Sequence, residues 1–179
     1  KKKSLKVNLE IAPTNEMLKI VLKNPPDYVC IVPEKRNEVT TEGGLNLKKN
    51  LQYLKKFIKT LNDRKIRTSL FINPSLSDIK IAKKIGSECV ELHTGKFCNY
   101  FNKKKKYREE LNKLKKCVLY ANKLNLEVHA GHGLTLSSTK IISKIKGIRE
   151  LNIGHYIISQ SIFNGLKKTI INFKKILKK

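Results

Sequence analysis

The sequence predicts a parallel α/β fold. Short segments rich in apolar and β-branched residues alternate six times with longer segments of helical periodicity. Such alternation makes neighbouring strands parallel, because each helix carries the chain back to the edge of the sheet where the previous strand began. Polar residues and glycines recur after the strand segments, where the ligand sites of open and barrel-forming parallel sheets gather.

The strands are identified by apolar runs that helices separate. In the first of them, Val7, Leu9 and Ile11 alternate with Asn8 and Glu10, so one face is apolar and the other polar. The later runs are short and mostly apolar, which is typical of buried parallel strands. Strands are expected at residues 6–11, 27–32, 66–72, 89–92, 126–130 and 150–153.

The helices carry ordinary boundary signals. Thr14 precedes one helix, Pro74 and Ser75 open another, and Gly147 follows the last turn of a third. The lysine run at 103–106 indicates a solvated loop or helix start rather than a binding patch. Helices are expected at 15–22, 47–62, 75–85, 107–124, 137–145 and 156–177. No linker or change of composition divides the chain, so we expect one domain over residues 1–179.

The charge of the chain suggests two explanations. There are 39 Lys and Arg against 14 Asp and Glu, a formal net charge of +25. This charge would attract a phosphate backbone, so nucleic-acid binding is one hypothesis. Only five of the basic residues are Arg, the residue that groove readout uses most, and Asn and Ile are enriched together with Lys. We favour codon drift in an adenine- and thymine-rich genome over a nucleic-acid partner.

Composition also bears on location. No stretch approaches the roughly 18 to 20 apolar residues of a membrane helix, and Glu10 interrupts the first apolar stretch, so no export signal is expected. The cysteines show neither a CxxC pair nor zinc-ligand spacing. We expect reduced thiols, no metal and a cytoplasmic protein. The cysteines are Cys30, Cys89, Cys98 and Cys117.

Three side chains near strand ends are candidates for acid–base chemistry. Glu10 and Glu91 both face the polar side of their strands, where burial and mutual repulsion can separate two carboxyl pKa values. His132 stands between Gly131 and Gly133, and imidazole is suited to proton transfer near neutral pH. The alternatives are a structural pair of Glu10 with a lysine and a structural role for His132.

Gly154 and His155 open the last expected helix. The free N–H groups and the dipole of a helix start bind anions, and the loops after the last two strands are a common phosphate site in barrels. A glycine at this position is also an ordinary helix cap. Together with the acid–base candidates, this feature indicates an enzyme that handles phosphorylated substrates.

Five motifs in register resemble the pyridoxine 5'-phosphate synthase family of vitamin B6 biosynthesis. The resemblance runs from about Val7 to the C-terminal helix. The blocks VPEKR with TTEGGL and ELNIGH are highly specific to that family, and His129 and Gln160 are mild departures from its pattern. The motifs are NLE at 8–10, VPEKR at 32–36 with TTEGGL at 40–45, ELHTG at 91–95, AGHGL at 130–134 and ELNIGH at 150–155.

The resemblance implies a (β/α)8 TIM barrel that forms homo-oligomers and needs no metal or organic cofactor. Its substrates would be 3-amino-2-oxopropyl phosphate and 1-deoxy-D-xylulose 5-phosphate, and its products pyridoxine 5'-phosphate, phosphate and water. Glu10 would be a proton acceptor, Glu91 a stabiliser of the transition state and His132 a proton donor. Thr40 would contact the deoxyxylulose phosphate. The cradle for the aminoketone phosphate would consist of Gly133, Gly154 and His155.

The resemblance also implies that this chain supplies about the last six βα units of eight. Family members carry two earlier units with a further catalytic histidine and phosphate-binding arginines, which have no counterpart before the NLE strand here. We therefore expect little or no turnover from the 179 residues alone. An inactive remnant of the enzyme is the alternative.

Overall fold

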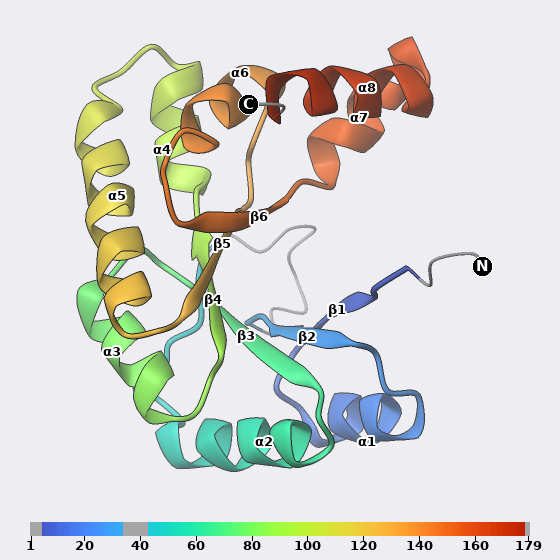
Figure 1. Ribbon diagram of the computed structural model, residues 1–179, viewed down its shortest axis with the longest axis vertical. Coiled ribbons are helices and arrows are strands. Elements are labelled where there is room, and N and C mark those ends of the chain that lie inside the picture. Colours follow the sequence, from blue (N-terminus) through green and yellow to red (C-terminus); the bar gives the residue numbers. More distant parts are fainter. Residues whose placement is uncertain (1–4, 34–42, 178–179) are drawn as a thin grey trace.

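The computed structural model describes residues 5–33 and 43–177. Six strands form one sheet in the order of the sequence, and every neighbouring pair is parallel. The sheet curves from β1 and β2 through β4 to β6, with α1, α2, α3 and α5 along its outer side (Figure 1). The strands are β1 (Asn8–Ile11), β2 (Tyr28–Ile31), β3 (Arg67–Ile72), β4 (Cys89–His93), β5 (Glu127–Gly131) and β6 (Ile148–Asn152). All six predicted strands are confirmed, with their ends within two residues.

The helices return the chain between the strands. Thr14 and Ser75 cap two of them as predicted, since the Thr14 hydroxyl accepts from the Met17 N–H and that of Ser75 from the Asp78 N–H. The helices are α1 (Asn15–Lys23), α2 (Leu51–Asp63), α3 (Leu76–Lys84), α4 (Gly95–Asn102), α5 (Arg108–Lys123), α6 (Leu136–Ile142), α7 (His155–Asn164) and α8 (Leu166–Leu177). No helix in the described ranges is both long and apolar enough to cross a membrane.

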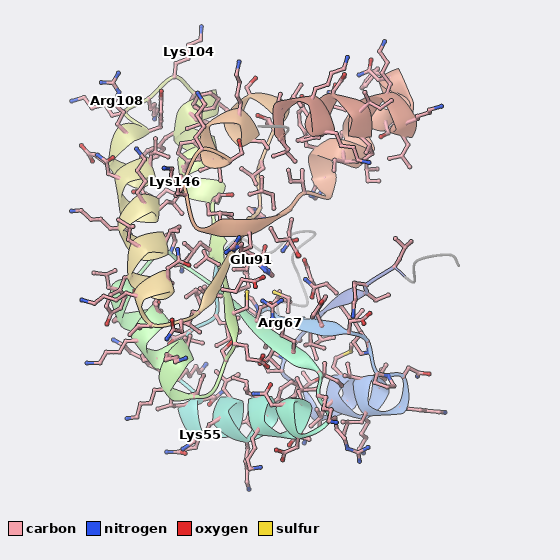
Figure 2. All side chains as sticks on the ribbon, in the orientation of Figure 1. Lys55, Arg67, Glu91, Lys104, Arg108 and Lys146 are labelled. Atoms are coloured by element: carbon pink, nitrogen blue, oxygen red, sulfur yellow. The ribbon has the colours of Figure 1, made fainter. Side chains whose placement is uncertain are left out.

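Two faces of the sheet differ in polarity. Side chains such as Val29, Leu70 and Val90 point outward and are fully buried against the helices, where they form the hydrophobic core. The alternate positions, including Glu91 and His129, point to the inner side of the curve. Figure 2 shows Glu91 inside the curved sheet, whereas Lys55 and Lys104 extend from the periphery into solvent. The apolar face packs against the helices in the core, and the polar face carries candidate site residues such as Glu91.

The predicted helix over 156–177 is wrong, because the structure has two helices there. Gly165 separates α7 from α8 with φ 75° and ψ 147°, which is outside helical geometry, and its N–H closes α7 by donating to the carbonyl of Ser161. Glycine adopts this positive φ without strain from a Cβ. The helical period continues on both sides of Gly165, so the pattern alone conceals the break.

Helix α4 was not predicted. It is only eight residues long, and its ends carry no capping side chain. Phe97 and Phe101 stack at 5.9 Å between ring centroids, and both make edge contacts with Tyr107 ahead of α5. Such a short helix depends on these tertiary contacts rather than on local signals. The lysine run at 103–106 follows α4 and is exposed, as predicted.

Candidate functional site

A pocket of about 670 Å³ opens at the carboxyl ends of the strands. Six of the seven residues singled out from the sequence line it, and they come from β1, β4 and the segments after β5 and β6. Thr40, the seventh, lies outside the described residues. The pocket is lined by Glu10, Val32, Phe71, Glu91, His132, Gly133, Leu134, Thr135, Asn152, Ile153, Gly154, His155, Tyr156 and Ser159.

Glu91 is a buried carboxyl at the floor of this pocket, with only 3% of the residue exposed. Asn152 Nδ2 donates to Glu91 Oε2 at 2.6 Å, and the Cys30 thiol donates to the same oxygen at 3.5 Å. Gly131 makes room on the neighbouring strand, because a Cβ there would overlap Glu91 Oε1. Burial raises the pKa of Glu91 to about 7, with the Asn152 hydrogen bond opposing this rise and the charge of Glu10 adding to it.

Glu10 is the second carboxyl of the pocket, and it is exposed. No hydrogen bond or ion pair joins it to another residue of the described ranges, so no described lysine occupies the structural pairing considered above. Its neighbour on the same face, Asn8, instead reaches across to Glu150 Oε1 at 3.4 Å. Glu10 therefore presents its carboxylate to the pocket, while Glu91 lies in a drier environment. These two environments suit two different roles.

His132 has an unusual backbone conformation, with φ at 77°. A residue with a Cβ rarely adopts this angle, and it persists only when the surroundings hold it. The Thr94 hydroxyl donates to the carbonyls of Gly131 and His132 at 2.7 and 2.6 Å, and the Thr94 N–H donates to Gly131 O at 2.8 Å. These hydrogen bonds fix the turn that carries the imidazole into the pocket.

The far wall of the pocket is built from backbone and two helix starts. Gly133 has φ at 73°, and Gly154 precedes α7 with open space on its Cβ side. His155 is the first residue of α7, and among the described residues no side chain caps its first turn, whose N–H groups have no partner within the helix. Thr135 at the start of α6 lines the same pocket, and its hydroxyl accepts from the Ser138 N–H. The arrangement is suited to an anionic group.

Several pocket residues were missed at the sequence level. Asn152 could have been found, since it lies two residues before Gly154 in ELNIGH and on the inner face of β6. Ser159 lies one helical turn after His155 and therefore on the same side of α7. Phe71 and Tyr156 carry no distinguishing sequence signal. No group of three or more His, Cys, Asp or Glu able to hold a metal occurs in the parts of the chain that the structure describes.

Fold and pocket together define a partial (β/α)8 barrel with a pocket at the carboxyl ends of its strands, lined by two glutamates, two histidines and the start of a helix. The tryptophan synthase α-subunit of Pyrococcus furiosus superposes with a TM-score of 0.61 at 14% identity, covering 98% of this chain and 66% of that one. A citrate synthase, SbnG, superposes with a TM-score of 0.56 at 13% identity, covering 96% and 73%. At these identities the likeness concerns the fold alone.

The sequence comparisons define the family. Residues 1–179 match the family described as pyridoxal phosphate biosynthesis protein PdxJ, and the chain belongs to it. The pyridoxine 5'-phosphate synthase of Pelagibacter ubique is 55% identical over 179 residues, covering all of this chain and 75% of that protein. Those of Sulfurihydrogenibium sp. and Ehrlichia chaffeensis are 44% and 46% identical, covering 97% and 98% of this chain and 71% and 72% of theirs. The chain thus spans about three quarters of these relatives, the share that six βα units make of eight.

Proposed function

We propose that the complete product of this gene is a pyridoxine 5'-phosphate synthase. It condenses 3-amino-2-oxopropyl phosphate with 1-deoxy-D-xylulose 5-phosphate to pyridoxine 5'-phosphate, phosphate and water. The observation that carries the proposal is the convergence of two unlike carboxyls, an imidazole and the start of α7 on one pocket in a chain of this family. Ring closure from two carbonyl compounds needs repeated proton transfers between positioned groups, and this pocket offers such groups.

Each acid–base residue has a role that its surroundings support. Glu10 is exposed in the pocket and accepts protons as a carboxylate. Glu91 has a pKa of about 7 because it is buried, so its ionised form is available near neutral pH to stabilise positive charge that develops on the condensing amine. His132 donates protons to the oxygen atoms of the leaving groups. Its imidazole extends from the turn that the Thr94 hydroxyl holds.

The phosphate of the aminoketone binds at Gly133, Gly154 and His155. The uncapped first turn of α7 supplies N–H donors, and the positive φ of Gly133 lets the backbone approach a ligand closely. Thr40, which lies outside the described residues, contacts the deoxyxylulose phosphate. We further propose a cytoplasmic homo-oligomer, with residues 1–179 forming part of a single barrel domain.

The proposal is tested by incubating the purified complete gene product with both phosphates and detecting pyridoxine 5'-phosphate by mass spectrometry. Product must require both substrates and must be accompanied by an equivalent of inorganic phosphate. Absence of product from folded protein contradicts the proposal. Turnover of a single sugar phosphate without the aminoketone would indicate a different barrel enzyme. Nucleic-acid binding that persists at physiological salt would support the alternative drawn from the charge.

The activity of the 179-residue chain alone is tested in a separate experiment. If the family's two earlier βα units supply a required histidine and the phosphate-binding arginines, this chain alone shows little or no turnover. Steady-state turnover by the 179 residues would show that the six units suffice.

A further inference from the structure

His93 lies beside the pocket without lining it. It ends β4, two residues after Glu91, so both side chains point to the inner face of the sheet. Only 9% of His93 is exposed, and its Nε2 has no hydrogen-bond partner among the described residues. A ring nitrogen buried without a hydrogen bond costs free energy, so the hydrogen bonding of Nε2 does not explain why an imidazole stands here.

The ring of His93 is held between two other rings. Phe71 meets it edge-on, with centroids 5.2 Å apart and an interplanar angle of 84°. His132 lies over it with centroids 4.7 Å apart and an interplanar angle of 32°, a tilted stack of the two rings. His132 is also within 6.4 Å of Phe71. The three rings form one cluster in which only His93 contacts both others closely.

Gly95 supplies the space for this stack. A Cβ at Gly95 would lie 2.7 Å from His93 Cε1 and 2.9 Å from His132 Cδ2, which is closer than real contacts allow. Thr94, between His93 and Gly95, holds the His132 carbonyl through its hydroxyl. The segment 93–95 therefore fixes His132 twice, through the backbone at Thr94 and through the ring at His93.

The charge state of His93 is compatible with this arrangement. Burial, together with the nearness of His132, lowers the pKa of His93 to about 4, so the ring is neutral at physiological pH. A neutral ring can stack on His132 without repelling a proton that His132 carries. The other titratable groups on the inner face of β4 are Glu91 and Cys89.

We propose that His93 is a positioning residue that orients the His132 imidazole by ring stacking. The inference depends on the proposed function only in assigning proton donation to His132. His93 itself neither lines the pocket nor transfers a proton. What matters is its flat ring rather than its nitrogen atoms.

Two substitutions separate the ring from the nitrogens. His93→Phe keeps a flat ring and removes the nitrogens, whereas His93→Gln keeps a polar side chain of similar length and removes the ring. In the complete gene product we expect His93→Gln to lower kcat about 10-fold or more, with KM for both substrates within about 2-fold, because positioning affects the reacting geometry. We expect His93→Phe to retain kcat within about 3-fold of the wild type.

A matched control is Val90→Ala, on the same strand but facing the helices, where the side chain is fully buried. It should lower the melting temperature and leave kcat of the folded protein unchanged, since its side chain points to the opposite face of β4 from that of His93. If His93→Phe is as impaired as His93→Gln, or if both retain wild-type kcat, the proposal is wrong.

A measurement that needs no turnover keeps the inference distinct from the proposed function. The stacked His93 ring shifts the proton resonances of the His132 imidazole, so in histidine-labelled protein His93→Gln must move them. Unchanged His132 resonances in this variant overturn the stacking, even where His93→Phe does not fold. If the wild-type protein makes no pyridoxine 5'-phosphate but His93→Gln still moves the His132 resonances, the proposed function is refuted and the stacking is supported.

Discussion

Two polar clusters on the inner face of the sheet shift the pKa of a carboxyl in opposite directions. In the pocket, the described donors to buried Glu91 are neutral, Asn152 and Cys30, and its pKa is raised to about 7. Near the other ends of the strands lies the lower cluster, composed of Arg67, Glu127 and His129. There Glu127 Oε1 accepts from Arg67 at 2.7 Å and lies 2.9 Å from His129 Nε2.

The pKa of Glu127 moves the other way. Burial favours its neutral form, but the hydrogen bonds and charges of Arg67 and His129 outweigh burial and hold its pKa below the ordinary value. Both carboxyls belong to short parallel strands of one sheet, so strand geometry does not cause the difference. The difference comes from the charge of the neighbouring side chains. The lower cluster stabilises an ionised carboxyl, while the pocket keeps one able to change charge near neutral pH.

Glu91→Gln tests the pocket side of this comparison most strongly. The amide keeps the shape but cannot ionise, so we expect kcat of the complete gene product to fall about 100-fold or more. The same substitution should raise the free energy of unfolding above neutral pH. A carboxyl whose pKa is raised by folding makes the protein less stable as the pH rises from 4.5, the pKa in the unfolded chain, to about 7. Above about pH 7 the loss of stability is constant.

At about 1.4 kcal/mol per pKa unit, the buried ionised Glu91 costs about 3 kcal/mol above pH 7. Glu91→Gln should therefore be more stable than the wild type at about pH 8 and similar to it at about pH 4, as urea unfolding would show. A variant that is only as stable as the wild type at both pH values would mean that Glu91 is not buried as a titrating group.

Gly131→Ala tests the space around Glu91 rather than its charge. The added Cβ overlaps Glu91 Oε1, so the carboxyl must leave the position in which it accepts from Asn152. Displacement of a reacting group by about 1 Å can cost about 100-fold in rate, and we expect a loss of kcat of this order. Circular dichroism checks that the variant is folded. Retention of wild-type kcat would indicate that Glu91 tolerates other positions.

Much of this contrast follows from the sequence, but not all of it. The alternation of Asn8 and Glu10 with apolar residues predicts the inner polar face, and the motif glycines predict where the backbone approaches a ligand. Glu10, Glu91 and His132 could be chosen because each follows the strand period or stands among glycines. The structure places all three on one pocket.

What the sequence could not predict depends on contacts between distant segments. The stack of His93 on His132 joins residues 39 positions apart, and the hydrogen bond of Asn152 to Glu91 joins residues 61 apart. Helix α4 has no local cap, and the break at Gly165 lies within an unbroken helical period. Neither periodicity nor composition reports such pairings, so these features appear only in the folded chain.

Asn152→Leu sharpens the comparison by removing the donor that partly offsets the burial of Glu91. The hydrogen bond lowers the pKa of Glu91, so its loss must raise that pKa above about 7. If the ionised carboxylate is the active form, the rising limb of the pH profile of kcat/KM moves about one pH unit to the alkaline side. At neutral pH this lowers kcat/KM about 5-fold, while at high pH the rate recovers. A uniform loss at all pH values would argue for misfolding or lost substrate contacts instead.

Glu127→Gln is expected to have the smallest effect on activity and tests the lower cluster. The glutamine keeps the side-chain shape but loses the attraction of Arg67 and His129. Because the side chain of Glu127 is 38% exposed and that of Arg67 26%, solvent screens the pair, and the loss of stability at about pH 7 should be only about 1 kcal/mol.

The pH dependence of this effect has the opposite sign from that at Glu91. A carboxyl with a lowered pKa contributes stability above its unfolded pKa and loses it as the pH falls through the folded one. The deficit of Glu127→Gln should therefore be present near pH 7 and vanish at low pH in urea unfolding, with kcat within about 2-fold of the wild type. A large loss of kcat in folded Glu127→Gln would mean that the two clusters act together in the chemistry, because the charges of the lower cluster would then reach the pocket.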